Sequence, residues 1–139
     1  MLLAVAAIAK LADMQGFAVV VDSYRALPAE LLGKAAWLLA FVELGLSIAL
    51  IFGPAIEARV PAARAWISAR FAAVFALHLM YMVWLVLAYL RGLDIPNCGC
   101  FGVYWPRPLT AYSLLEDAVL LLLSARLWYA MSQRQNVYR

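Results

Sequence analysis

Long apolar stretches, interrupted by few charges, occupy most of the chain. Three of them, at about 35–53, 65–90 and 109–131, reach or nearly reach the length of a bilayer crossing. A membrane helix needs about 20 mainly apolar residues to cross about 30 Å of hydrocarbon, and it satisfies its own backbone polar groups. The sequence lacks the alternating polarity of a transmembrane strand. These stretches predict an all-α integral membrane protein.

The N-terminal stretch is apolar but shorter. Residues 1–14 include Lys10 and Asp13, and about 13 residues of helix extend only about 20 Å. We expect a short or truncated first helix that crosses the bilayer in part, so the predicted fold is a four-helix transmembrane bundle. Residues 16–28 then place apolar side chains on one helical face and end at Pro28. This pattern predicts an amphipathic segment that lies in the membrane interface.

Composition supports the membrane assignment. Hydrophobic residues make up 68% of the chain and charged residues 14%, and the mean hydropathy is +0.88. Soluble domains contain about 45–50% apolar and about 25% charged residues. We therefore treat 1–139 as a single membrane domain whose main partner is the lipid bilayer. The net charge of +3 is scattered without a basic run, which argues against nucleic acid as a partner.

Basic residues near the helix ends predict the orientation, because cytoplasmic loops are enriched in lysine and arginine. One side carries Arg59, Arg64, Arg70, Arg126, Arg134 and Arg139, and the other carries Arg25, Lys34, Arg91 and Arg107, with Lys10 as a further candidate. The excess on the first side predicts a multi-pass protein of the bacterial inner membrane with both termini in the cytoplasm. The loop between the third and fourth helices then faces the periplasm, where a disulfide can persist.

Both cysteines of the chain lie in that loop, in the stretch NCGCFG (97–102). A disulfide between Cys98 and Cys100 would need a tight turn, which Gly99 permits because it has no Cβ. Such a bridge would be strained, and strained, exposed disulfides are the oxidising and labile ones. The pair is therefore predicted to be a redox site. A soft metal such as mercury or Cu(I), or an inert turn, remains an alternative, whereas two thiolates supply only half of a zinc site.

Four acidic or imidazole side chains fall inside the expected membrane helices. Glu43 and His78 lie near the middle of the second and third helices, where an ionised group costs about 2.5–3.5 kcal/mol or more. A Glu43–His78 pair would either carry a proton during redox chemistry or hold the helices together. Glu116 and Asp117 are adjacent on the fourth helix, so one is expected to face protein and the other the interface or a second subunit.

Aromatic side chains gather near the expected helix ends. Tyr81 and Trp84 approach the outer end of the third helix, and Tyr104 and Trp105 follow the cysteines. An interfacial aromatic belt explains most of them. Alternatively, Trp105 and Phe101 offer a partner protein an apolar landing patch.

Four motifs carry a resemblance to a known family. In chain order they are AKLAD (9–13), SYRALPAEL (23–31), ELGLSIALIFG (43–53) and NCGCFG (97–102). Together they resemble the MauE branch of the MauE/DoxX-like redox-associated membrane proteins. The resemblance implies a four-helix membrane bundle in which Cys98 and Cys100 exchange electrons with a thioredoxin-like periplasmic protein while another, disulfide-rich protein matures. Glu116 and Asp117 depart from it, because an arginine–asparagine pair is expected there.

Three functions follow as hypotheses. The first is a membrane component of a thiol–disulfide relay with Cys98 and Cys100 as its catalytic residues. The second is a non-catalytic accessory subunit of a larger membrane complex, and the third is a soft-metal transporter. The sequence contains neither a second thiol pair nor a cofactor motif. It leaves open whether the chain is an enzyme, and it leaves a quinone cofactor open without supporting one.

Overall fold

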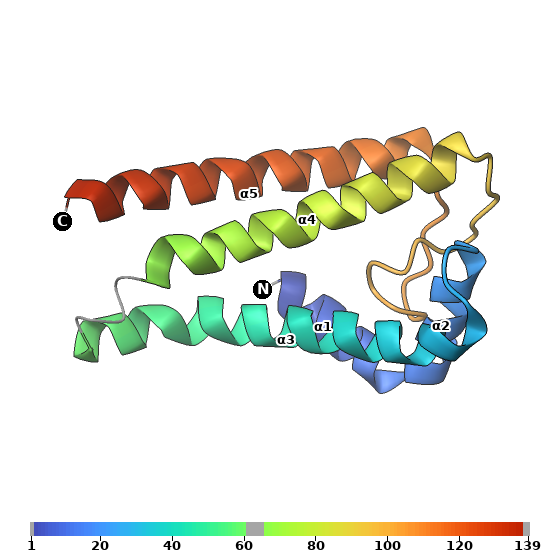
Figure 1. Ribbon diagram of the computed structural model, residues 1–139, viewed down its shortest axis with the longest axis horizontal. Coiled ribbons are helices and arrows are strands. Elements are labelled where there is room, and N and C mark those ends of the chain that lie inside the picture. The colour runs from blue at the N-terminus through green and yellow to red at the C-terminus, as the bar shows by residue number, and fades with distance from the viewer. Residues whose placement is uncertain (1, 61–65, 138–139) are drawn as a thin grey trace.

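The computed structural model describes residues 2–60 and 66–137, and every regular element in these ranges is a helix. The helices are α1 (Leu2–Ala12), α2 (Met14–Ser23), α3 (Ala29–Arg59), α4 (Ile67–Leu90) and α5 (Ala111–Val137). Helices α4 and α5 lie side by side, and α1 and α2 pack on α3 to form a second layer (Figure 1). The prediction of an all-α protein is confirmed for the described residues.

Two of the described helices, α3 and α4, are long and apolar enough to cross a membrane, and each contains an 18-residue stretch with a mean hydropathy of 2.2. Helices α1 and α2 would count as a third crossing if the bent pair is taken as one span. Helix α5 is 27 residues long, but it contains Glu116, Asp117 and Arg126 and is not among these candidates. The chain is thus a membrane protein whose described residues contain two strongly apolar crossings, or three if the bent pair is one span. The predicted bundle of four membrane helices is not confirmed.

The chain bends by 103° between α1 and α2, and Asp13 accounts for the bend. Its side chain accepts a hydrogen bond from the Gly16 backbone at 2.8 Å and so caps the start of α2. The segment expected to lie in the interface over 16–28 is therefore a helix that starts earlier and ends at Ser23. Its apolar face is buried against α3, where Phe17 and Val21 pack with Ala36.

Helix α3 continues past the position where the sequence predicted its end. Proline removes one backbone donor from a helix, and membrane helices tolerate it where a neighbour satisfies the freed groups. Here Arg70 of α4 donates to the Ala49 carbonyl at 3.2 Å and forms an ion pair with Glu57. Gly53 makes room for this guanidinium, which would overlap a Cβ at that position. The cross-helix contact holds α4 against the turn of α3 that precedes Pro54.

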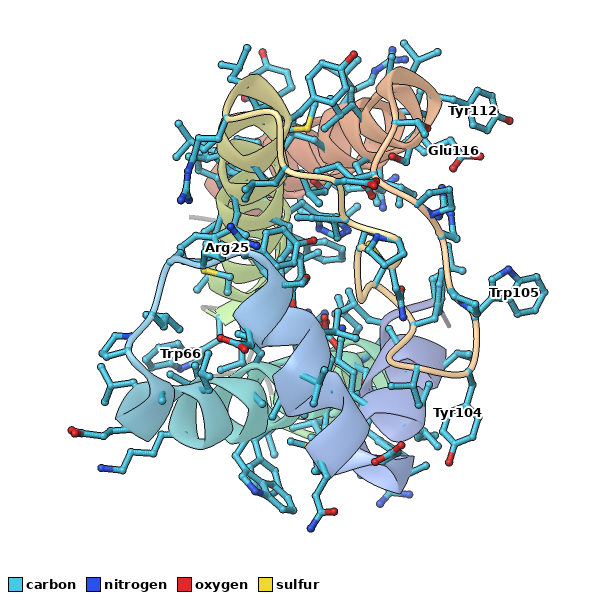
Figure 2. All side chains as sticks on the ribbon, turned by 90° about the vertical axis from the view of Figure 1, so that its right-hand side faces the viewer. Arg25, Trp66, Tyr104, Trp105, Tyr112 and Glu116 are labelled. Atoms are coloured by element: carbon cyan, nitrogen blue, oxygen red, sulfur yellow. The ribbon has the colours of Figure 1, made fainter. Side chains whose placement is uncertain are left out.

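The segment between α4 and α5 folds back into the end of the molecule. Backbone hydrogen bonds join Cys98 to Arg107 at 2.7 Å and Leu109 to Ile95 at 2.9 Å, so the segment forms a narrow, closed loop. Viewed from this end, the loop lies between the two helical layers, with Trp105 directed outward at its rim (Figure 2). The loop is thus held inside the bundle end rather than extended away from it.

Candidate functional site

The NCGCFG turn is held by hydrogen bonds from its first residue. The Asn97 side chain accepts from the Gly99 backbone and donates to the Gly102 carbonyl, both at 2.9 Å. Gly99 and Gly102 have φ values of +79° and +62°, a region that residues with a Cβ seldom adopt. Asparagine and the two glycines therefore specify the turn in which the cysteines lie.

The turn packs directly against the bend between α1 and α2. A methyl group at Gly99 would lie 2.7 Å from Cγ1 of Val20, and one at Gly102 would lie 3.0 Å from the Ala9 carbonyl oxygen. Tyr24, just after α2, donates from its hydroxyl to the Cys98 carbonyl at 2.7 Å. The turn that carries the thiols therefore packs against α1 and α2 and is hydrogen-bonded to the residue after α2.

The two thiols lie close together without a bond between them. Their sulfur atoms are 3.2 Å apart and both cysteines are free, whereas a disulfide bond is about 2.05 Å long. Cys98 is 8% exposed, and Cys100 is partly buried. The turn therefore brings the sulfur atoms within about 1 Å of bonding distance, as a pair that alternates between dithiol and disulfide would require.

The thiols differ in acidity. A hydrogen bond from the Cys100 thiol lowers the pKa of Cys98 to about 6; Arg107 also lowers it, and burial acts in the opposite direction. The pKa of Cys100 is raised, because its proton is shared with the Cys98 sulfur and because it is buried. The thiolate is the reactive form of cysteine. The difference in acidity favours Cys98 over Cys100 as the thiolate of the pair.

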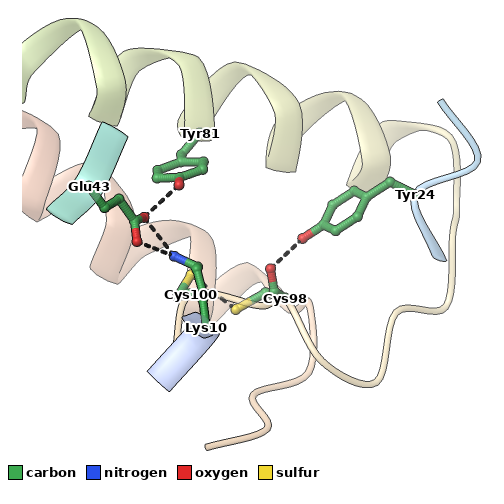
Figure 3. A network of polar contacts seen from close by, with 6 residues as sticks. All are labelled: Lys10, Tyr24, Glu43, Tyr81, Cys98 and Cys100. Atoms are coloured by element: carbon green, nitrogen blue, oxygen red, sulfur yellow. Dashed lines mark hydrogen bonds and ion pairs between the residues drawn. The ribbon is translucent and has the colours of Figure 1, made fainter. Parts of the chain in front are cut away.

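A buried ion pair lies beside the thiols (Figure 3). Both carboxylate oxygens of Glu43 accept from the Lys10 ammonium at 2.6 Å, and Tyr81 donates its hydroxyl to the same carboxylate at 2.5 Å. The side chains of Lys10 and Glu43 are only 2% and 3% exposed. The Lys10 ammonium also lies 5.4 Å from the centre of the Phe17 ring. The network links α1, α3 and α4 in an apolar interior.

This network replaces the predicted Glu43–His78 pair. In the structure, Glu43 pairs with Lys10 and Tyr81, and His78 donates from Nδ1 to the Val74 carbonyl of its own helix at 2.8 Å. The sequence reasoning missed Lys10, counted only for orientation, and Tyr81, assigned to an aromatic belt. A signal was present, because two opposite charges in apolar helices are expected to pair.

The adjacent acidic residues of α5 have different surroundings. Glu116 forms an ion pair with Arg107 of the thiol loop. Asp117 has a carboxylate oxygen, Oδ2, that is buried and has no hydrogen-bond partner among the described residues. Glu116 therefore links the loop to α5 through its ion pair, and among the described residues no donor forms a hydrogen bond with Asp117 Oδ2.

A cavity of about 590 Å³ lies between the two helical layers. All six residues singled out from the sequence line it, and they are Glu43, His78, Cys98, Cys100, Glu116 and Asp117. Lys10 and Tyr81 line it as well, and most of the remaining wall is apolar. Small-molecule sites usually have volumes of about 300–1,000 Å³ and combine apolar walls with a few polar groups. The structure thus joins the predicted residues in one cavity of that kind.

Metal binding finds less support in this geometry. In residues 2–60 and 66–137, no group of three or more His, Cys, Asp or Glu side chains is placed to hold a metal ion. The two cysteines are the only thiolate ligands of the chain, so thiolates alone would give a soft cation two-coordinate binding.

Comparison with known proteins identifies one family. The family model described as "Methylamine utilisation protein MauE" matches residues 1–130. No curated protein and no solved structure matches the chain.

Proposed function

This chain belongs to the MauE family of membrane proteins, and we propose that it is the membrane component of a thiol–disulfide relay. Cys98 and Cys100 exchange electrons with a thioredoxin-like protein during the maturation of another protein. The observation that carries the proposal is the preorganised thiol pair, with sulfur atoms 3.2 Å apart. The unequal acidity of the two thiols supports it, since thiol–disulfide exchange depends on the pKa values of the attacking and leaving sulfur atoms.

The acidity of the pair also suggests an order of events. A thiolate of the partner attacks the Cys98–Cys100 disulfide at the Cys100 sulfur, and Cys98 leaves as the thiolate, since the thiol of lower pKa is the better leaving group. A second thiolate of the partner then attacks its own sulfur in the mixed disulfide and releases Cys100, which takes up a proton. The partner loses two electrons and becomes a disulfide, and the Cys98–Cys100 pair gains them.

Trapping the mixed disulfide tests this order. The oxidised full-length chain in lipid nanodiscs is mixed with reduced thioredoxin in which the second cysteine of the Cys-x-x-Cys site is replaced by serine. A mixed disulfide that maps to Cys100 by peptide mass supports the proposal. Absence of any mixed disulfide contradicts the relay, and a bond only to Cys98 contradicts the order. The variant carrying both Cys98→Ser and Cys100→Ser is the control.

The proposed location is the bacterial inner membrane, with the thiol loop on the periplasmic side. The excess of basic residues at the opposite end supports this orientation. The test uses a cysteine-free chain that carries either Tyr104→Cys near the thiols or Trp66→Cys at the start of α4, both at exposed positions. A membrane-impermeant maleimide added to intact spheroplasts should label the first variant and spare the second. The reverse pattern would contradict the orientation.

One observation favours a second function, that of an accessory subunit. Gly45 lies on the exposed surface of α3, and a methyl group there would meet nothing within 4 Å. Together with Ala49 it forms a small-xxx-small pair, which lets a second membrane helix approach closely. Under this function the chain assembles with other membrane subunits through α3. Gly45→Leu should then abolish copurification with such subunits, whereas replacing both cysteines by serine should not.

A further inference from the structure

The two thiols face the interior of the molecule. Both line the cavity between the helical layers, and Lys10, Glu43 and Tyr81 line it as well. The loop that carries the thiols lies at one end of the bundle (Figure 1) and forms part of the cavity wall. A redox partner of the dithiol that occupies the cavity would therefore meet mainly apolar walls.

The cavity is also lined by apolar side chains that are exposed at the surface of the helices. Leu2, Leu38 and Val119 line it and are 59%, 64% and 51% exposed. They belong to α1, α3 and α5, on which exposed leucine, isoleucine and valine side chains are frequent. An apolar molecule dissolved in the bilayer can reach these side chains without passing through water, whereas a hydrophilic oxidant would have to leave its hydration shell.

We propose that the cavity takes the head group of a lipid-soluble quinone, and that this quinone oxidises the Cys98–Cys100 dithiol. The inference rests on the proposed relay and names its electron acceptor. It explains why a dithiol that serves a partner protein is turned toward an apolar cavity.

The polar groups of the cavity fit a head group with two ring oxygens. Lys10 uses two of its three N–H donors on Glu43 in the described structure, so one remains for a carbonyl oxygen. Asp117 Oδ2 has no hydrogen-bond partner among the described residues and can accept from a quinol hydroxyl. The Nε2 atom of His78 is a second acceptor, since Nδ1 donates to Val74. The cavity thus has a donor for the oxidised head group and acceptors for the reduced one.

The reaction balances with these components. The Cys98 thiolate and the Cys100 thiol give up two electrons and form the disulfide bond. The quinone takes these two electrons and two protons and becomes the quinol. One proton comes from the Cys100 thiol, and the other comes from water, which received it when Cys98 ionised. The disulfide is then ready for reduction by the thioredoxin-like partner.

Quinone reduction by the purified chain tests the inference without any partner protein. The full-length chain in nanodiscs is reduced with dithiothreitol, freed of reductant, and mixed with ubiquinone carrying a decyl tail. The loss of quinone absorbance should correspond to one quinol per chain, with both thiols lost together. The Cys98→Ser and Cys100→Ser variants should form no quinol, because a single thiol cannot close the disulfide. Absence of quinol with the unchanged chain would overturn the inference.

A variant of the cavity wall separates binding from thiol chemistry. Leu120 lines the cavity, whereas Leu122 lies on the same helix, is 65% exposed and does not line it. Leu120→Trp should raise the quinone concentration needed for half-maximal rate by about tenfold or more, and Leu122→Trp should change it by less than about twofold. Equal effects of the two variants would overturn the inference.

A second readout keeps the result interpretable. The rate at which iodoacetamide modifies Cys98 shows whether each variant retains the folded turn, and only variants with an unchanged rate are compared. Formation of the mixed disulfide with thioredoxin should be the same in Leu120→Trp and the unchanged chain. If the mixed disulfide forms and the unchanged chain reduces no quinone, the quinone inference fails and the proposed relay remains.

Discussion

Replacing Lys10 by methionine should strongly destabilise the protein. The change removes the cation from a pair whose side chains are 2% and 3% exposed. Among the described residues, it leaves the buried Glu43 carboxylate with only the Tyr81 hydroxyl as a partner. Breaking a buried pair by removing one charge costs about 3–5 kcal/mol, since the remaining charge is uncompensated. A hydrogen bond between membrane helices contributes only about 0.6 kcal/mol on average. The two magnitudes are far enough apart for one experiment to distinguish them.

The free energy of unfolding, measured by titration with a denaturing detergent in mixed micelles, provides the test. We expect Lys10→Met to lower the free energy of unfolding by about 3–5 kcal/mol. The double variant Lys10→Met, Glu43→Gln should recover more than half of this loss, because neither side chain of the pair is then charged. Lys34→Met is the matched control, since Lys34 is exposed on α3, and it should change the value by less than about 0.5 kcal/mol. A loss of only about 0.6 kcal/mol for Lys10→Met, or no recovery in the double variant, would refute the reasoning.

Three further predictions concern the thiol turn. The rate of Cys98 alkylation by iodoacetamide should rise with pH around a midpoint near 6. Cys100→Ala should move this midpoint up toward about 8.5, because alanine cannot donate a hydrogen bond to the Cys98 sulfur. Equal midpoints in both proteins would contradict the assignment. Gly99→Ala should lower the free energy of unfolding by about 1–3 kcal/mol, and Gly92→Ala should lower it by less. Both glycines have a positive φ, but only Gly99 lacks space for a methyl group. Equal losses of unfolding free energy would show that packing against the turn is unimportant. Tyr24→Phe removes the hydrogen bond to the Cys98 carbonyl and should lower the free energy of unfolding by about 1 kcal/mol, and no change would show that this bond adds nothing.

The sequence predicted the members of the site better than their partners. Polar side chains are costly in apolar helices, so Glu43 and His78 could be selected without a structure. The cavity contains both of them together with the cysteines. The partner of Glu43 could not be selected in the same way, because Lys10 faces α3 only after the chain has bent at Asp13. Hydrophobic periodicity gives the face of a helix, and it does not give the direction of the next helix.

Helix ends show a similar limit. The sequence predicted that the helix over 35–53 ends just before Pro54, since proline disrupts a helix. Helix α3 nevertheless continues to Arg59, and Arg70 of the next helix contacts it just before Pro54. Arg70 was counted in the sequence only as a basic residue near a helix end. The end of a helix in a packed protein therefore depends on groups that are distant in sequence, and a local pattern cannot contain them.

The short first helix has a structural role at the thiol site. The two glycines of the turn approach α1 and α2 so closely that a Cβ at Gly99 would meet Val20 and one at Gly102 would meet the Ala9 backbone. Such an approach is available only because the chain changes direction by 103° at Asp13, which directs α1 and α2 past two sides of the turn. A straight helix through these residues could not contact both glycines, since Ala9 and Val20 would then lie about 16 Å apart along one axis. The bend and the CGC turn therefore depend on each other, and a change at Asp13 should disturb the acidity of Cys98 although the two residues share no hydrogen bond.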